Sequence, residues 1–232
     1  MLTFDAVTTY ADAHWESHAK RCVETFREFW AGIKLRTLTD AQLELGSEWL
    51  PEFKQRHRHR PTHNYRFDAV RFAHKVAAIE MAFRAGDSDV LIWIDADCVT
   101  HAPVNPEWLS GLLGDADLGY LRRATKYPEC GFVMIRRSQA GAELVKAMVR
   151  LYQTDRLFDL PEWHDCMALD HARQMLGTRW TSLSGDAEAT GHPLVNGPLG
   201  ARLDHLKGKR KAAGKSMKSD LKRNRTEAYW NG

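Results

Sequence analysis

The sequence has 232 residues, of which 44% are hydrophobic and 27% are charged, and its formal net charge is only +3. The length suits one domain with a substantial core, and the composition excludes a disordered chain. No apolar run approaches the roughly 20 residues that cross a membrane, and the N-terminus lacks a basic stretch followed by a long apolar one. We therefore expect a cytoplasmic protein with no membrane partner. The oligomeric state is left open.

The first predicted strand spans residues 2–7 and is followed at once by Thr8, Thr9 and Tyr10. Apolar residues at helical spacing then predict a helix over 12–31, which Gly32 is well placed to end. A second strand is predicted over 33–38. The residues that follow the first strand read either as ligand contacts or as a polar turn with one aromatic anchor.

Residues 51–64 are rich in histidine and arginine and contain two prolines, so we predict a loop. Its basic part, 56–60, is a candidate contact for an anionic partner. Three histidines of this stretch offer a metal site, but no carboxylate or cysteine nearby completes the set; they are His57, His59 and His63.

A long helix is predicted over 65–85, and it carries Arg71 and Lys75. The five apolar residues of 90–94 then read as a strand buried on both faces. That strand stops at two carboxylates, Asp95 and Asp97. Buried like charges need a partner, and Mg²⁺ or Mn²⁺ is a suitable one. The alternative is a strand end whose acidic residues are solvated or cap a turn.

Further along the chain, a short helix is predicted over 103–113 and a strand over 118–123. Gly131 opens the next strand, 132–135, and would let the backbone approach a ligand closely. Glu129 comes directly before it. An amphipathic helix follows over 138–153.

The strand that ends in Asp95 and Asp97 resembles the D-x-D strand of GT-A-type nucleotide-sugar glycosyltransferases. The resemblance implies a single α/β domain with a mixed, Rossmann-like sheet flanked by helices. It also implies that the two aspartates hold a divalent ion on the donor diphosphate. The other residues to which it assigns donor contacts are Thr8 and Thr9 with ribose or phosphate, Tyr10 with the base, Arg71 and Lys75 from the helix, and Gly131 beneath the sugar.

The segment Trp163-His164-Asp165 is similar to the W-H-D-E-S segment of glycosyltransferase family 6, in which the aspartate binds the donor sugar. Asp165 matches that aspartate, but Cys166 stands where the family has its proposed glutamate nucleophile. The covalent nucleophile therefore does not carry over. Catalytic candidates are Asp165 and Glu129. The alternative is a helix start with Asp165 near its N-terminus.

The spacing of His205, Gly208 and Lys211 resembles the H-x-x-G-x-x-K element of family 8, the glycogenin-like enzymes. There the histidine is the third metal ligand and the lysine contacts the diphosphate. An imidazole ligand suits Mn²⁺ better than Mg²⁺. We accordingly divide the chain into a GT-A domain, 1–206, and a basic tail, 207–232, that closes over the donor site.

Together the resemblances imply metal-dependent sugar transfer from a nucleotide diphosphate, by default UDP, to a hydroxyl acceptor with retention of configuration. Since the family 6 glutamate is absent, we favour front-face substitution. If the reaction inverts, Asp165 or Glu129 would be the general base.

The acceptor is suggested by charge, because ten Lys or Arg residues face only three acids from Arg202 onward. Such clustering is the footprint expected for a polyanion, and the chain also looks like small transferases encoded by bacteriophages. We therefore expect a hydroxymethylated pyrimidine in DNA, in a host cytoplasm, contacted by the tail and residues 56–60. The alternatives are a glycan or protein acceptor and, in another class, a non-catalytic nucleic-acid-binding protein.

The four cysteines, Cys22, Cys98, Cys130 and Cys166, show no C-x-x-C spacing. Neither a zinc cluster nor a disulfide framework is therefore indicated by sequence spacing. We expect reduced thiols, mostly in the core.

Overall fold

The computed structural model describes residues 1–60 and 64–232. His63, one of the three histidines considered as metal ligands, lies outside the described residues. Within them, no helix has both the length and the apolar composition that spanning a membrane requires.

A six-stranded mixed sheet forms the centre of the molecule, in the order β2-β1-β3-β6-β5-β7. Strands β1 and β2 are parallel, as are β1 and β3, whereas β6 runs antiparallel to both β3 and β5. A second sheet pairs β4 with β8. The strands are β1 Phe4–Tyr10, β2 Lys34–Thr39, β3 Val90–Ile94, β4 Cys98–Thr100, β5 Leu118–Leu121, β6 Glu129–Arg136, β7 Trp180–Ser182 and β8 Leu203–His205.

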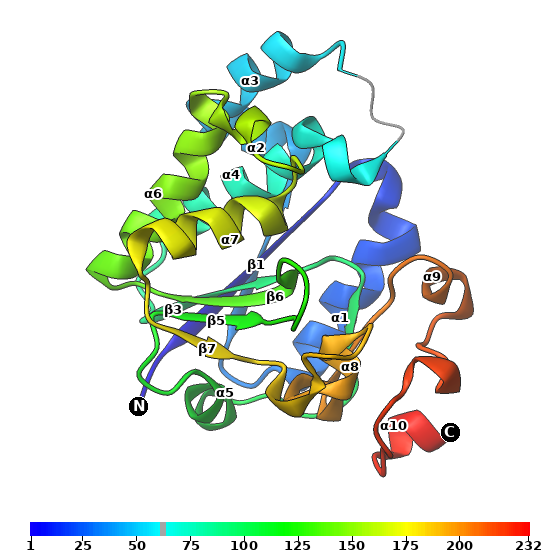
Figure 1. Ribbon diagram of the computed structural model, residues 1–232. Coiled ribbons are helices and arrows are strands. Elements are labelled where there is room, and N and C mark those ends of the chain that lie inside the picture. The colour runs from blue at the N-terminus through cyan, green and yellow to red at the C-terminus, as the bar shows by residue number, and fades with distance from the viewer. Residues whose placement is uncertain (61–63) are drawn as a thin grey trace.

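Helices cover both faces of the sheet (Figure 1). One face is covered by α2 Asp40–Gly46, α3 Leu50–His57, α4 Ala69–Ala85, α6 Gln139–Gln153 and α7 Asp165–Leu176. The other is covered by α1 Lys20–Phe29, α5 Pro106–Leu113 and α8 Pro193–Asn196, with α9 Arg210–Ala213 and α10 Ala228–Asn231 in the C-terminal segment. The prediction of an α/β protein with a mixed sheet between helices is confirmed.

The central strand β3 is buried along its whole length, as its five apolar residues predicted. The prediction of one helix over 12–31 holds only in part, because α1 is preceded by a 3₁₀ turn, Asp12–His14, and a π-helical turn, Trp15–Ala19.

The prediction of a loop over 51–64 was wrong for its first half. Residues Leu50–His57 form α3, in which Pro51 occupies the first turn. Proline is tolerated there because the amide it lacks would have no partner within the helix. Leu50, Phe53 and His57 recur at helical spacing and are buried, so this face packs on the core.

The topology brings several distant segments to one edge of the sheet. Parallel strands β1 and β3 end at this edge, and antiparallel β6 begins there, because Ile94 pairs with Phe132. The second sheet lies beside it, since Cys98 on β4 pairs with His205 on β8. The edge therefore collects the end of β1, the D-x-D turn, the start of β6 and the end of β8.

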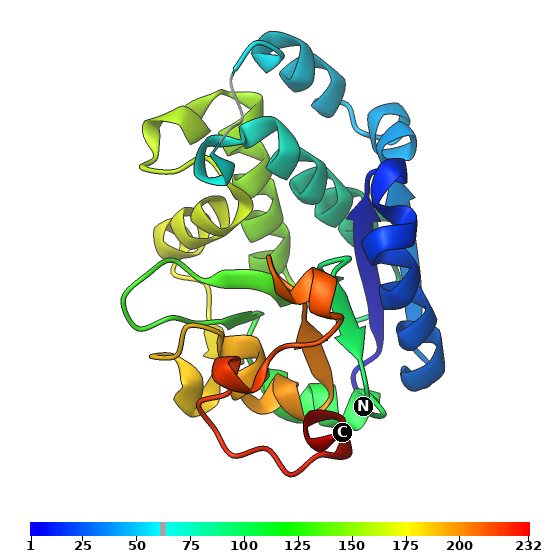
Figure 2. The same ribbon diagram turned by 90° about the vertical axis from the view of Figure 1, so that its right-hand side faces the viewer.

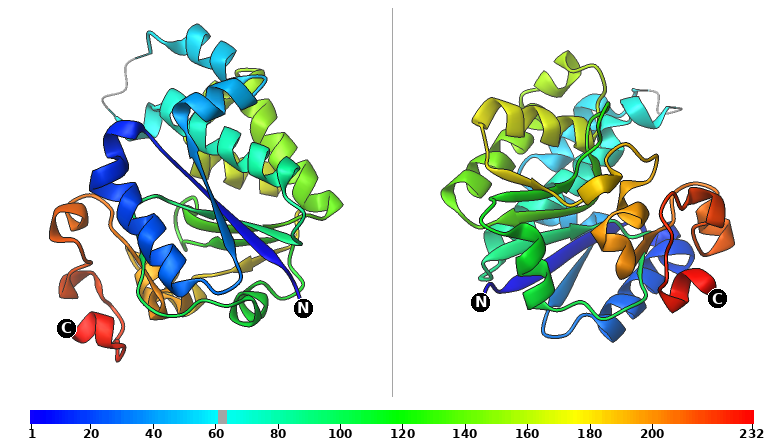
Figure 3. Two further views of the ribbon diagram at one scale, coloured as in Figure 1. Left: turned by 180° about the vertical axis from the view of Figure 1, so that it is seen from behind. Right: turned by 60° about the horizontal axis from the view of Figure 1, so that its bottom comes forward.

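The C-terminal segment, orange to red in Figure 2, lies on the side of the sheet that faces the viewer there. It is packed against the domain rather than free. Trp230 is 3% exposed and donates a hydrogen bond to Gly200 O at 2.8 Å. Seen from behind in Figure 3, the same segment runs beside α1, and Arg21 of α1 donates a hydrogen bond to Gly214 O.

Candidate active site

The D-x-D turn joins β3 to β4. The Asp95 amide donates to Gly131 O at 2.9 Å, and the Cys98 amide closes the turn on Asp95 O at 2.9 Å. This backbone arrangement holds Asp95 and Asp97 at the end of the buried strand, where both side chains are partly accessible. The turn therefore presents two carboxylates at the edge where open α/β sheets bind ligands.

His205 reaches this turn from β8. Its Nε2 lies 3.0 Å from Oδ1 of Asp97 and 3.5 Å from Oδ2 of Asp95. The imidazole is fully buried, and burial alone would lower the pKa of His205. The charges of Asp97 and Glu129 outweigh that effect and raise the pKa to about 9.

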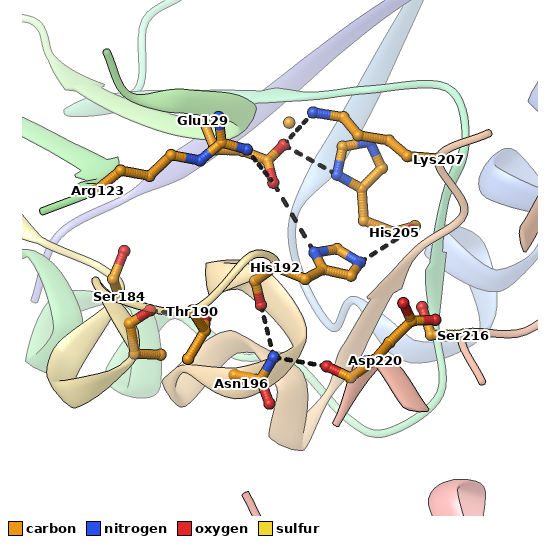
Figure 4. A network of polar contacts seen from close by, with 12 residues as sticks. Arg123, Glu129, Ser184, Thr190, His192, Asn196, His205, Lys207, Ser216 and Asp220 are labelled. Atoms are coloured by element: carbon orange, nitrogen blue, oxygen red, sulfur yellow. Dashed lines mark hydrogen bonds and ion pairs between the residues drawn. The ribbon is translucent and has the colours of Figure 1, made fainter. Parts of the chain in front are cut away.

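Glu129 lies on the other side of the His205 ring, with Oε1 at 3.1 Å from Nδ1 (Figure 4). The carboxylate is 1% exposed and is surrounded by nitrogen-bearing side chains. Lys207 forms an ion pair with it, Arg123 approaches to 3.7 Å and His192 to 3.9 Å. Burial would raise the pKa of Glu129, but Lys207 and His205 hold it well below its usual range.

Gly131 explains how the ring fits beside β6. A Cβ at this position would lie 2.3 Å from Cε1 and 2.5 Å from Nδ1 of His205. Only glycine leaves that space, so the close approach of Gly131 is to His205.

Lys75 enters from α4 and joins two carboxylates. Its Nζ lies 2.9 Å from Oδ1 of Asp95 and 2.7 Å from Oδ2 of Asp165, and it also donates to Cys130 O at 2.6 Å. Burial would lower the pKa of Lys75, but Asp165 and Asp95 raise it well above its usual value. Asp165 is the first residue of α7 and is buried, with His164 capping the helix. The D-x-D turn and the W-H-D segment are thus linked through one lysine.

Lys211 approaches the turn from the C-terminal segment, with Nζ 3.0 Å from Oδ2 of Asp97. Gly208, three residues earlier, has φ +59°, a left-handed conformation that glycine adopts readily. Burial would raise the pKa of Asp97, but His205 and Lys211 hold it far below its usual range.

The remaining predicted donor contacts stand apart from this network. Thr8 is fully buried and its hydroxyl has no partner among the described residues. Thr9 donates to Leu38 O at 2.6 Å, and Tyr10 packs against Trp15 with ring centroids 5.1 Å apart. Arg71 is exposed on the first turn of α4 and forms no ion pair with a described residue.

Several residues of the network escaped the sequence analysis as site residues. Lys207, which the sequence presents only as part of the basic tail, belongs to the network, and so do Arg123, His192 and Trp93. Trp93 donates from Nε1 to Oδ1 of Asp95 at 2.6 Å. No spacing in the sequence marks Arg123, His192 and Lys207, because each comes from a different part of the chain. All three lie outside the strands, and the tertiary fold brings them together.

His57 and His59 take no part in this network. Nε2 of the buried His57 lies 2.7 Å from Oδ1 of Asp155, while Arg60 stacks over Phe158 at 3.7 Å from the ring centroid. Residues 56–60 are therefore partly engaged within the molecule.

The donor set of two carboxylates and one imidazole fits a divalent cation such as Mn²⁺ or Mg²⁺. Asp95, Asp97 and His205 would hold it. The fit rests on the orientation of His205, because Glu129 beside Nδ1 leaves Nε2 directed at the aspartates. Metal-bound histidines commonly have such a carboxylate on the other ring nitrogen.

The sequence matches no protein-family model and no curated protein. Among solved structures, the apo form of the glycosyltransferase GlyE from Streptococcus pneumoniae TIGR4 is similar, with a TM-score of 0.50 and 11% identity over 79% of this chain and 46% of that one. The chain has a glycosyltransferase fold. A second crystal structure of GlyE has a TM-score of 0.49 and 14% identity over 77% of this chain and 45% of GlyE. The chain thus spans less than half the length of the GlyE chains it matches.

Proposed function

We propose that this chain is a metal-dependent glycosyltransferase that moves a sugar from a nucleotide diphosphate, by default UDP, to a hydroxyl acceptor. The observation that carries the proposal is the convergence of Asp95, Asp97 and His205 at the edge of the sheet, with Nε2 of His205 3.0 and 3.5 Å from the two carboxylates. The glycosyltransferase fold supports it.

The metal, when bound, supplies a Lewis acid that offsets the charge growing on the leaving diphosphate. Lys211 is well placed to assist as a point charge, because its ammonium already lies beside Asp97. Thr9 and Tyr10, which are partly exposed at the end of β1, would contact ribose or phosphate and the base, with Arg71 available from α4, whereas Thr8 is fully buried.

Lys75 and Asp165 would hold the donor sugar. The ammonium fixes the carboxylate of Asp165 at 2.7 Å, so Asp165 can accept hydrogen bonds from sugar hydroxyls in one orientation. A fixed orientation supplies much of the rate by proximity.

We propose retention by front-face substitution. The bond from the anomeric carbon to the diphosphate breaks, the bond to the acceptor oxygen forms on the same face, and the acceptor proton passes to a diphosphate oxygen. Cys166 occupies the position of the missing glutamate, and Glu129 is enclosed by Lys207 and His205. An inverting reaction would instead need Asp165 as its general base.

The decisive experiment measures release of nucleoside diphosphate from a panel of nucleotide sugars with Mn²⁺. We expect release that depends on Mn²⁺ and falls on the order of 10²-fold or more in Asp97→Ala. The matched control is Asp159→Asn, which changes a surface aspartate whose side chain is 74% exposed. This variant should release nucleoside diphosphate as the wild type does. Release that survives Asp97→Ala unchanged would refute the proposed site.

For the acceptor we propose hydroxymethylated DNA, contacted by the C-terminal segment. Much of the positive charge of that segment is already paired, since Arg210 bonds Asp220 and Arg223 bonds Asp186. Three exposed lysines have no acidic partner among the described residues and would be the phosphate contacts: Lys209, Lys218 and Lys222.

The acceptor is tested by adding hydroxymethylated or unmodified DNA to the release assay. An increase with hydroxymethylated DNA that disappears when the three lysines are changed to Gln would support it. Release indifferent to DNA would favour a glycan or protein acceptor. DNA binding without release from any donor would favour a non-catalytic nucleic-acid-binding protein.

A further inference from the structure

Two cysteines and a carboxylate meet beside the donor-sugar residues, although the sequence separates them. Cys130 lies on β6, whereas Asp165 and Cys166 open α7. The sulfur atoms of both cysteines and a carboxylate oxygen of Asp165 all lie within 4.8 Å of one another. Four cysteines are free in the structure, so both thiols are available as ligands.

The two oxygens of Asp165 have different neighbours. Oδ2 is paired with Lys75 at 2.7 Å, whereas Oδ1 faces Sγ of Cys166 at 3.7 Å. Oδ1 can therefore bind a further cation while Oδ2 keeps its ion pair.

A divalent cation would offset most of the negative charge of this cluster. Two thiolates and Asp165 would carry three negative charges, and the ammonium of Lys75, which is shared with Asp95 at 2.9 Å, offsets only part of them. Cys130 is buried, whereas Cys166 is partly exposed and marks the side of the cluster nearer the surface.

We propose that Cys130, Asp165 and Cys166 form a second cation site, selective for a soft divalent ion such as Zn²⁺ or Cd²⁺. Thiolate ligands select such ions, whereas the oxygen-rich site at Asp95 and Asp97 suits Mn²⁺ or Mg²⁺. The two sites thus differ in chemistry although Lys75 touches both. The expected effect on activity rests on the proposed function. An ion in the second site would inhibit sugar transfer, because it binds the carboxylate that orients the donor sugar.

The test is a Cd²⁺ titration of the whole chain under a non-thiol reductant, followed by the ultraviolet charge-transfer absorption of cadmium thiolates. Excess Mn²⁺ is present throughout to occupy the oxygen-rich site at Asp95 and Asp97. We expect the absorption to saturate at one Cd²⁺ per chain, and a large excess of Zn²⁺ to compete with the Cd²⁺. No absorption at one equivalent would overturn the proposal.

Single variants assign the ligands. Cys130→Ser and Cys166→Ser should each abolish the saturable absorption, and Asp165→Asn should weaken binding by at least about tenfold. Cys22→Ser, at another buried thiol, should leave it unchanged. Circular dichroism shows whether each variant folds. If Cys130→Ser does not fold, Cys166→Ser, at the partly exposed cysteine, still tests the proposal.

The ligand atoms of a second group, Asp97, Cys98 and His205, also lie within 4.8 Å of one another. The test must therefore show which of the two groups binds the soft ion. If Cys98→Ser abolishes the absorption while Cys130→Ser keeps it, the soft ion binds there and the proposal is wrong. The readout uses no nucleotide sugar, so its failure and the failure of the proposed transferase activity are separate results.

Discussion

Nδ1 of His205 lies 3.1 Å from Oε1 of Glu129, while Nε2 of the same ring lies 3.0 Å from Asp97. The histidine is thereby held between a buried carboxylate and the D-x-D turn. We predict that Glu129→Gln weakens Mn²⁺ binding by about 10–100-fold, since the second carboxylate orients the ring and raises its basicity. Electron paramagnetic resonance of free Mn²⁺ measures the affinity. Glu188→Gln, which removes a carboxylate paired with Arg122, should leave it unchanged; an equal loss in both variants would contradict the positioning role.

The protonation of His205 makes Mn²⁺ binding depend on pH. The pKa of His205 in the metal-free protein is about 9, so below that pH the ring carries a proton that the ion must displace. We predict that the Mn²⁺ affinity rises about tenfold for each pH unit from pH 7 and levels off above pH 9. Calorimetry in buffers of different ionisation enthalpy should show proton release on binding. In His205→Gln the slope should vanish, and a slope that persists would assign the proton to another group.

The same pKa shift sets the stability of the metal-free protein. Folding raises the pKa of His205 above 6.5. The contribution of this histidine to the free energy of unfolding is therefore complete below pH 6.5 and is lost as the pH rises through about 9. We predict that the midpoint of urea unfolding falls across this interval in the presence of a chelator. Excess Mn²⁺ should reduce or reverse the fall, because binding strengthens over the same interval. A midpoint that rises with pH in the chelated protein would contradict the assignment.

Lys75 compensates two carboxylates in the interior. We predict that Lys75→Met lowers the free energy of unfolding by about 3–5 kcal/mol, because it leaves Asp95 and Asp165 without their cation. Urea denaturation measures the change. Adding Asp165→Asn to this variant should recover part of the loss. Lys20→Met, which breaks an exposed pair with Glu16, is the control and should leave the midpoint of urea unfolding essentially unchanged.

Gly131 leaves room for His205, and filling that room should displace the ring. We predict that Gly131→Ala lowers the free energy of unfolding by about 1–3 kcal/mol and weakens Mn²⁺ binding, since the new Cβ would lie 2.3 Å from Cε1 of His205. Gly111→Ala is the matched control, because a Cβ there meets nothing within 4 Å and the residue lies inside α5. That control should gain stability by about 0.5–1 kcal/mol. Similar behaviour of the two variants would show that His205 adjusts freely.

Trp230 tests whether the C-terminal segment belongs to the folded domain. The side chain is 3% exposed and packs with the core on the α1 side of the sheet. We predict that Trp230→Ala lowers the free energy of unfolding by about 3–5 kcal/mol. Met217→Ala, at a 46% exposed apolar side chain of the same segment, should change it little. A negligible effect of Trp230→Ala would mean that residues 207–232 fold as a separate tail.

The local features of this protein could be predicted from the sequence because they depend on neighbouring residues. The apolar run of β3 and the carboxylates that end it are adjacent in the chain, and burial of β3 follows from its composition. The helix start at Asp165, which the sequence offered as the alternative to a sugar-binding role, is likewise a local feature. Helix α3 was missed because two prolines suggested a loop, although one of them occupies the first helical turn.

Only the tertiary structure decided which charges meet. Lys75 joins Asp95 to Asp165 because α4 and α7 pack together on one face of the sheet. Glu129 faces His205 because strand order and register bring the start of β6 and the end of β8 to one edge. No local pattern encodes that register. Burial then decides what each carboxylate can do: Glu129 is enclosed among cations and supports a histidine, whereas Asp95 and Asp97 remain partly accessible at the end of their strand.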